Sequence, residues 1–265
     1  MSNSQIRKIV LLGAGNLATN FALTLKKRDF SILQVYNRNL RSGKKLAEKV
    51  SASYTGDLSE LRNDADLYAL AVSDSAIREV AENIHLDKQL LIHFSGTAEL
   101  DLLEGASRNY GILYAPQTFI KNNTAGFLGI PICCEANNPE TEIKLEQFAR
   151  SFSDKILHIN SYQRKIIHLS AIFAGNFTNF MYSIAQDMLT ENNLPMDILE
   201  PIIKKTSSNS RCENIFRQQT GPAIREDHTI LNSHLEFLSY RPELREVYRI
   251  LSESIIKYKH NNDKL

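Results

Sequence analysis

The chain has 265 residues, of which 43% are hydrophobic and 23% are charged, and its formal net charge is +1. This length is enough for one large or two modest domains with a sizeable core. The charged residues are dispersed, so the sequence carries no basic block typical of a nucleic-acid-binding surface. No apolar run approaches the roughly 18 residues that span a membrane, and the first residues lack the layout of a signal peptide.

The three cysteines, Cys133, Cys134 and Cys212, form no C-x-x-C pair. An odd number without metal-ligand spacing argues against a disulfide framework or a zinc site and favours a reducing compartment. We therefore expect a cytoplasmic protein without a metal ion, and without nucleic acid or a membrane as its partner.

Short apolar runs alternate with helical patterns over residues 1–160. Near-continuous apolar runs are typical of strands buried on both faces of a parallel sheet, and their alternation with helices predicts βαβ units. Residues 1–160 are therefore expected to form an α/β domain with a mostly parallel sheet. The expected strands are Lys8–Leu12, Ile32–Tyr36, Leu67–Val72, Gln89–Phe94, Gly111–Tyr114, Ile130–Cys134 and Ile156–Ile159.

Residues 161–265 contain no convincing strand pattern and are expected to form an all-α second domain. Pro201 is expected to break or kink the second of the helices, because proline cannot continue the hydrogen-bond ladder. The expected helices are Tyr162–Glu191, Met196–Lys205, Arg211–Gln218, His228–Leu238 and Pro242–Lys257.

The segment Gly13–Ala18 reads GAGNLA and lies between the first expected strand and an amphipathic helix. In a G-x-G-x-x-A turn, the first glycine permits the tight turn and the second lets the backbone approach a pyrophosphate. The free N–H groups of the helix then bind the phosphates. An ordinary glycine turn is the alternative, but the flanking elements favour a Rossmann-type dinucleotide site. Its expected contacts include Gly13, Gly15, Asn16 and Leu17.

The second expected strand ends in Tyr36-Asn37-Arg38-Asn39. An NAD site usually places a carboxylate here for the ribose 2′-hydroxyl, whereas a 2′-phosphate needs a cation. The Arg38 guanidinium can bind a phosphate through two N–H groups and stack on adenine. A solvated cluster at a helix start is the alternative, but Asn37 and Arg38 favour NADP over NAD.

Two more loops are expected at the carboxyl ends of strands, where open α/β sheets bind ligands. The first carries Val72, Ser73 and Asp74 and would pass the ribose on the nicotinamide side. We also expect Asp74 or the next residue, Ser75, to cap the following helix. The second carries Ser95 and Gly96, which would lie near the nicotinamide ring, with a simple turn as the alternative.

With these motifs the chain resembles the NADP-binding domain of the pyrroline-5-carboxylate reductase and 6-phosphogluconate dehydrogenase superfamily, in which "NR" commonly follows the second strand. Over nearly its whole length it is similar to a bacterial group of NADP oxidoreductases with a Rossmann-like domain and a helical C-terminal domain of unknown role. The resemblance implies a two-domain, dimeric oxidoreductase and supplies no catalytic residue. The segments that carry it are GAGNLA, AVSDSAI (71–77), HFSGT (93–97), YAPQTF (114–119), HLSAIFAGNFTNF (168–180) and TGPAIREDHTILNSHL (220–235).

The chain departs from three related patterns. Prephenate-type dehydrogenases have a histidine before the proline of the loop that here reads Tyr114-Ala115-Pro116. The lysine and asparagine, about four apart, of β-hydroxyacid dehydrogenases have no clean match around Lys165 and His168. The Gly-Ser-Gly-Pro stretch of pyrroline-5-carboxylate reductases is not reproduced near Gly175.

The expected substrate cleft lies between the carboxyl edge of the sheet and the long helix. His168 is the candidate proton donor, with Ser95 and Asn176 beside it, and a bonded core histidine is the alternative. Arg225 could bind a substrate carboxylate, also across a dimer interface, although the turn around it could simply let Asp227 cap a helix. The other expected substrate contacts are Gln117 and Asn179, while Lys121 is expected to be a solvated loop lysine.

The sequence therefore predicts an NADP(H)-dependent oxidoreductase that transfers a hydride to or from a small carbonyl, imine or hydroxy acid. A homodimer through the helical domain is expected. Two alternatives stay open: a non-catalytic NADP-binding sensor or interaction protein, and a β-hydroxyacid dehydrogenase working in the oxidative direction.

Overall fold

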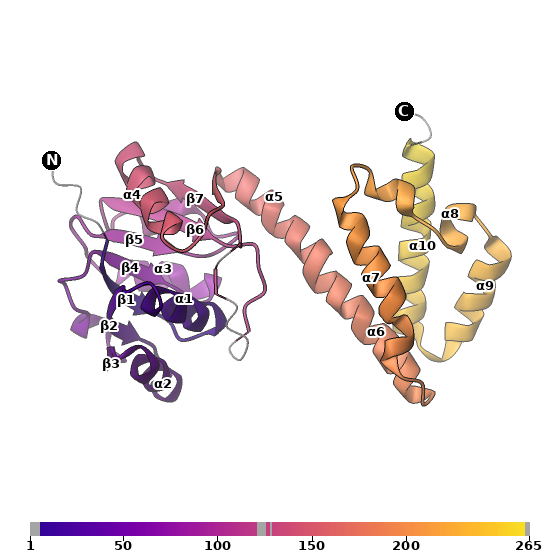
Figure 1. Ribbon diagram of the computed structural model, residues 1–265, viewed down its shortest axis with the longest axis horizontal. Helices are drawn as coiled ribbons and strands as arrows, with labels where there is room; N and C mark the ends of the chain where they lie inside the picture. The colour runs from indigo at the N-terminus through magenta and orange to yellow at the C-terminus, as the bar shows by residue number, and fades with distance from the viewer. Residues whose placement is uncertain (1–5, 121–125, 128, 263–265) are drawn as a thin grey trace. The chain divides into compact units, whose positions relative to one another are not determined.

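The computed structural model describes residues 6–120, 126–127 and 129–262 (Figure 1). The chain divides into two compact units, Met1–Ser183 and Ile184–Leu265. This division falls inside a helix, beyond residue 160, where the sequence pattern changes. No helix among the described residues is long and apolar enough to cross a membrane, and the cytoplasmic location stays a prediction.

An eight-stranded sheet in the order β3-β2-β1-β4-β5-β6-β7-β8 forms the centre of the first unit. Neighbouring strands are parallel except for the antiparallel pair β6 and β7, so the expected mostly parallel sheet is confirmed. The strand order reverses between β1 and β4, where open α/β sheets place their ligand crevice. The strands are β1 (Lys8–Leu12), β2 (Ser31–Tyr36), β3 (Ser53–Thr55), β4 (Leu67–Leu70), β5 (Leu90–His93), β6 (Asn109–Tyr114), β7 (Ile132–Ala136) and β8 (Ile156–His158).

Helices cover both faces of the sheet, which explains why the strands read as continuous apolar runs. Alternate residues of β1 enter two different core clusters: Leu11 faces one and Val10 the other. The first cluster packs under α1 (Asn16–Lys26), α2 (Leu40–Val50) and α4 (Pro139–Arg150), and the second under α3 (Asp74–Glu82). Phe21 of α1 is fully buried, with its ring against four other phenylalanine rings at centroid distances of 4.8–6.2 Å.

The predicted helix Tyr162–Glu191 is present, with one irregularity. It consists of α5 (Ser161–Ala171), a π-helical turn (Ile172–Phe177) and α6 (Thr178–Glu191). A reciprocal pair of hydrogen bonds between Asn160 and Gln163 begins it, each side chain accepting from the backbone N–H of the other. A π-helical turn contains an extra residue, so it rotates the residues that follow it around the helix axis.

The second unit contains the end of α6, then α7 (Glu200–Ser208), α8 (Pro222–Arg225), α9 (His228–Phe237) and α10 (Pro242–Asn262). Its described residues include no strand, as expected. Pro201 lies in the first turn of α7, where proline is tolerated, so it begins a helix rather than breaking one. The predicted helix Arg211–Gln218 is wrong, because only two short 3-10 turns form there. Asp227 does cap α9, accepting from Ile230 N at 3.2 Å.

Candidate active site

Different features of the structure explain the two glycines in the turn between β1 and α1. Gly13 has a φ of +121°, and a Cβ on it would lie 2.2 Å from the carbonyl oxygen of Ala71. The fold itself therefore requires glycine at this position. Gly15 has a φ of −73°, and an added Cβ would meet nothing within 4 Å. No side chain among the described residues caps α1 either, so its first N–H groups are left for another acceptor, as an anion site requires.

Arg38 extends from the turn after β2. Its side chain is 68% exposed and pairs with Glu79 at 3.5 Å, and an exposed pair of this kind is weak. The amide of Asn37 instead donates to the carbonyl oxygen of Asn39 (2.8 Å) and to Ser42 Oγ (2.9 Å), which fixes the start of α2. The turn therefore presents a solvent-accessible guanidinium on a rigid base.

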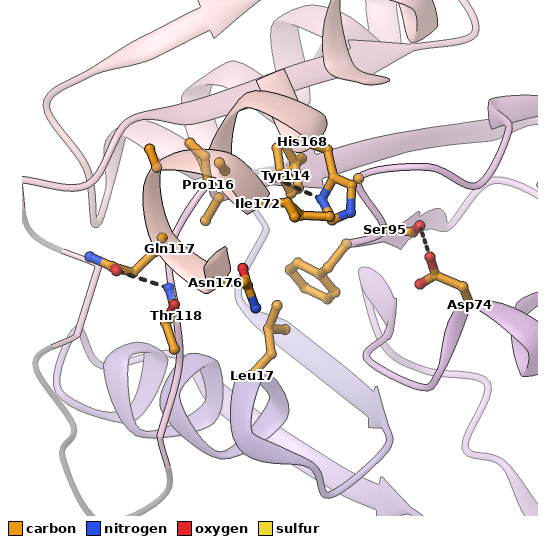
Figure 2. A pocket seen from close by; sticks show the side chains of 16 residues that line it. Leu17, Asp74, Ser95, Tyr114, Pro116, Gln117, Thr118, His168, Ile172 and Asn176 are labelled. Carbon is orange, nitrogen blue, oxygen red and sulfur yellow. Dashed lines mark hydrogen bonds between the residues drawn. The ribbon is translucent and has the colours of Figure 1, made fainter. Parts of the chain in front are cut away.

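The loops after β4 and β5 are joined by the carboxylate of Asp74. Its Oδ2 accepts from Ser95 Oγ (2.7 Å) and from Thr97 Oγ1 (2.8 Å), as Figure 2 shows for Ser95. Ser95 Oγ also accepts from the backbone N–H groups of Thr97 (3.1 Å) and Ala98 (2.9 Å). The expected capping role of Asp74 is wrong, since Ser73 occupies the N-cap position without a side-chain bond and Asp74 is the first helical residue.

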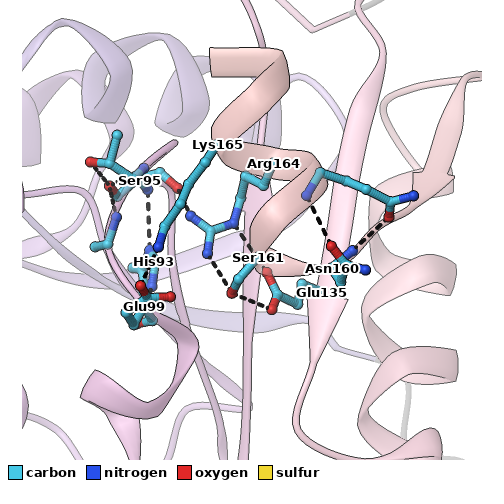
Figure 3. A network of polar contacts seen from close by, with 11 residues as sticks. His93, Ser95, Glu99, Glu135, Asn160, Ser161, Arg164 and Lys165 are labelled. Carbon is cyan, nitrogen blue, oxygen red and sulfur yellow. Dashed lines mark hydrogen bonds and ion pairs between the residues drawn. The ribbon is translucent and has the colours of Figure 1, made fainter. Parts of the chain in front are cut away.

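A buried arginine joins the Ser95 loop to α5 (Figure 3). Arg164 is 0% exposed. Its Nε donates to Glu135 (3.1 Å), and its terminal nitrogens donate to the carbonyl oxygen of Ser95 (3.1 Å) and to Ser161 Oγ (3.0 Å). Ser161 Oγ in turn donates to Glu135 at 2.6 Å. All three guanidinium nitrogens therefore have partners, as a buried charge requires.

His93, the last residue of β5, also contacts the backbone of the Ser95 loop through both ring nitrogens. Its Nδ1 accepts from the backbone N–H of Ser95 at 3.1 Å, and its Nε2 lies 3.4 Å from the carbonyl oxygen of Glu99. Burial, and after it the charge of Arg164, lowers the pKa of His93 to about 4. His93 is therefore a neutral structural side chain at neutral pH, and its ring nitrogens fix the backbone ahead of Gly96.

A cavity of about 430 Å³ opens between the carboxyl edge of the sheet and the face of α5 and the π-helical turn. Its size is typical of small-molecule sites. Figure 2 shows Leu17 from α1 on one side of it and His168 and Asn176 on the other. The predicted site residues that line the cavity are Leu17, Asp74, Ser95, Gly96, Gln117, His168 and Asn176.

Two predicted substrate contacts, Asn179 and Arg225, are not among the residues that line the cavity, and Lys121 lies outside the described residues. Asn179 follows the π-helical turn and does not line the cavity. The sequence pattern placed Asn179 on the same face as His168 because it assumed a regular helix. The extra residue of the π-helical turn rotates the helix, so that Asn176 lines the cavity instead. Arg225 ends α8 in the second unit.

Sequence reasoning missed two side chains of this site. Tyr114, the last residue of β6, lines the cavity, and its hydroxyl lies 3.2 Å from His168 Nδ1. Arg164 stands one helical turn before His168, and that spacing of four was a signal that both lie on one face. Nothing in the sequence marked this arginine as buried, because arginines are rarely buried unless they are paired.

Comparison with known proteins places the chain among oxidoreductases. A family model described as NADP oxidoreductase, coenzyme F420-dependent, matches residues 8–95, and a model of a domain of unknown function matches residues 130–255. No curated protein sequence matches the chain.

Solved structures that share the fold include the following three. A Bacteroides fragilis protein predicted to be an NADP oxidoreductase is 38% identical with a TM-score of 0.89, covering 95% of this chain and 98% of that one. A 1-pyrroline-5-carboxylate reductase from Streptococcus pyogenes is 16% identical with a TM-score of 0.62, covering 94% and 98%. An imine reductase from Myxococcus stipitatus in complex with NADP⁺ is 14% identical with a TM-score of 0.62, covering 97% and 94%. Because the first of these is 38% identical over almost the whole of both chains, this chain belongs to the same NADP oxidoreductase family.

Proposed function

We propose that this protein is an NADP(H)-dependent oxidoreductase that transfers a hydride to or from a small carbonyl, imine or hydroxy acid. The observation that carries the proposal is the cavity of about 430 Å³, which Leu17 of the phosphate-binding helix and His168 both line. A dinucleotide whose phosphates bind at the start of α1 would extend its nicotinamide toward that cavity. Hydride transfer then needs orientation and a proton donor or acceptor from the protein.

The cofactor assignment depends on Gly15 and Arg38. Open space at Gly15 leaves room for a pyrophosphate, and the exposed guanidinium of Arg38 suits a 2′-phosphate. The imine reductase among the similar structures binds NADP⁺, while the description of the matching family model also names coenzyme F420. Titration calorimetry with NADPH, NADH and a deazaflavin of the F420 type distinguishes these cofactors.

Arg38→Ala is the sharpest test of the 2′-phosphate contact. Hydrogen bonds to charged groups contribute about 1.5–3 kcal/mol, so NADPH affinity should fall by about 10- to 100-fold. NADH lacks the 2′-phosphate and serves as the internal control, because it can lose only the stacking on adenine and its affinity should fall less. Equal losses for both nucleotides, or no loss for NADPH, would contradict the assignment.

For the chemistry we assign proton transfer to His168 and orientation of the substrate carbonyl or imine to Asn176, with Gln117 at the cavity wall. Ser95 was a further catalytic candidate. Its hydroxyl proton is directed to Asp74, and we therefore assign it to holding the loop rather than to proton transfer. Roles for Asn179 and Arg225 in substrate binding stay predictions.

Turnover of NADPH with a panel of keto acids and cyclic imines, and of NADP⁺ with hydroxy acids, tests the activity. His168→Gln should lower kcat by about 10²- to 10⁴-fold, the usual contribution of a general acid, with unchanged NADPH affinity. Tight NADPH binding without turnover of any substrate would instead favour the non-catalytic sensor.

We further infer a homodimer through the helical unit. Among the described residues from Ile184 onward, the only buried hydrophobic residues are Ala223, Leu231 and Leu238, whereas Ile202 is 62% and Phe237 65% exposed. A helical unit needs a larger core than this for stability, and a second copy of the same chain supplies matching apolar faces.

Light scattering after gel filtration tests this inference. Ile202→Asp should weaken the dimer at least about fivefold, since the interface side chains that matter most for binding each contribute more than about 1 kcal/mol. Ser207→Asp, on the opposite side of α7, is the matched control and should leave the dimer intact. A wild-type chain that is monomeric at micromolar concentration would exclude the dimer.

A further inference from the structure

The imidazole of His168 has two neighbours at the cavity wall. One is the Tyr114 ring, 5.9 Å away between centroids at an interplanar angle of 66°, with its hydroxyl 3.2 Å from Nδ1. The backbone of Gly96 is also close, since an added Cβ there would approach His168 Nδ1 to 2.4 Å and Cγ to 2.6 Å. Gly96 therefore gives the ring the space it occupies, and Tyr114 gives one ring nitrogen a partner.

The other nitrogen of this ring is open. Among the described residues, none forms a hydrogen bond with His168 Nε2, and no buried side-chain nitrogen or oxygen lacks a partner. Nε2 is therefore accessible rather than buried. Since His168 lines the cavity, Nε2 is the nitrogen that a bound molecule can reach.

The hydrogen bond between Tyr114 and His168 can run in either direction, but the Tyr114 hydroxyl has no other acceptor among the described residues, which favours donation to Nδ1. Burial raises the pKa of Tyr114 to about 12, so the phenol keeps its proton near neutral pH. A neutral imidazole has one acceptor nitrogen and one N–H. When the phenol donates to Nδ1, the ring proton must be on Nε2, because the hydrogen bond at one nitrogen determines the tautomer.

We propose that Tyr114 is a positioning residue that holds His168 in the Nε2–H tautomer and so presents this N–H to the substrate. A neutral ring then polarises a carbonyl oxygen or imine nitrogen through Nε2–H. When the ring is an imidazolium, the Tyr114 oxygen accepts from Nδ1–H. Nε2 then gives its proton to the substrate oxygen or nitrogen as the hydride of the proposed NADPH adds to carbon. The product is an alcohol or amine, the cofactor is left as NADP⁺, and the ring is left neutral with its proton on Nδ1. The role toward substrate rests on the proposed function, whereas the tautomer does not.

The tautomer is measured by ¹⁵N NMR of the full-length chain labelled at histidine, without cofactor or substrate, at a pH where imidazoles are neutral. The spectrum of His168→Gln identifies the His168 signals. An isolated histidine already prefers Nε2–H, so the decisive readout is the change in Tyr114→Phe. This variant keeps the ring and removes the donor. We expect its Nδ1 signal to move toward that of a free acceptor and an Nδ1–H population to increase.

Tyr110→Phe on the same strand is the matched control, since Tyr110 does not line the cavity, and it should leave both signals in place. Gly96→Ala is a second variant that displaces the ring and should give the same loss as Tyr114→Phe. A wild-type ring protonated at Nδ1, or identical spectra for wild type and Tyr114→Phe, overturns the proposal.

If the proposed function is wrong but the tautomer proposal is right, the two assays give a different combination of results. In that case no substrate turns over, although Tyr114→Phe still changes the tautomer. Where a substrate does turn over, Tyr114→Phe should lower kcat by up to about tenfold, the contribution of one hydrogen bond, with unchanged KM for NADPH. An unchanged kcat would overturn the role toward substrate.

Discussion

The buried Arg164–Glu135 pair allows a direct comparison with an exposed pair on the next residue of the same helix. Arg164→Met removes a guanidinium that is 0% exposed and leaves the Glu135 carboxylate, 12% exposed, with Ser161 as its partner. It also leaves the carbonyl oxygen of Ser95 without this donor. Removing one partner of a buried ion pair costs about 3–5 kcal/mol, because the other charge stays buried.

Lys165→Met is the matched control. Lys165 pairs with Glu99, and the two side chains are 44% and 50% exposed. Exposed pairs contribute about 0.2–1 kcal/mol, so the two substitutions should differ by at least about 2 kcal/mol. The chain has no tryptophan, and urea unfolding is therefore followed by far-UV circular dichroism and tyrosine fluorescence.

The double variant Arg164→Met with Glu135→Leu separates a buried charge from lost packing. Replacing both members of a buried pair by apolar side chains is often neutral, so the double variant should regain most of the stability that Arg164→Met loses. Equal losses for Arg164→Met and Lys165→Met, or a double variant no more stable than Arg164→Met, would refute the reasoning.

Two further predictions concern groups whose surroundings the structure defines. His93 has a pKa of about 4 in the folded chain and about 6.5 when unfolded. The unfolded state therefore binds the extra proton between these values. The stability due to neutral His93 is complete above pH 6.5 and is lost as pH falls toward 4, by at most about 1.4 kcal/mol per pH unit. His93→Gln should flatten this slope in urea unfolding measured across that range, and parallel slopes for both proteins would contradict it. Gly13→Ala should prevent stable folding, because its Cβ would meet the Ala71 carbonyl oxygen at 2.2 Å. Gly15→Ala should change stability by about 1 kcal/mol or less while weakening NADPH binding in calorimetry, and unchanged binding would exclude the phosphate site.

The strands were predictable because burial on both faces leaves little choice of residue. Seven of them occur within two residues of the expected bounds, while β3 was missed. Ser53–Thr55 is a three-residue edge strand with one buried side chain, so it carries no apolar run. The G-x-G-x-x-A turn was predictable for a related reason, since the Gly13 backbone conformation excludes other residues.

The arrangement around His168 was only partly predictable. Periodicity identified the helix face that carries His168, but it assumed 3.6 residues per turn and therefore selected Asn179. The π-helical turn has no buried residue, and nothing in the local sequence marks where its extra residue is inserted. Tyr114 comes from a strand and Gly96 from a loop, and their contacts with His168 join residues far apart in the chain.

These contacts explain how the site could perform proton transfer with few groups. Among the described residues that line the cavity, His168 carries the only imidazole and Asp74 the only carboxylate. Asp74 binds the hydroxyls of Ser95 and Thr97, and Tyr114 retains its proton. Arg164 stands four residues before His168 on α5 and bonds to the carbonyl oxygen of Ser95. One arginine therefore fixes both the loop at the expected nicotinamide position and the helix turn that carries the proposed proton donor, so the proposed distance between cofactor and donor would depend on a buried contact rather than on a flexible loop.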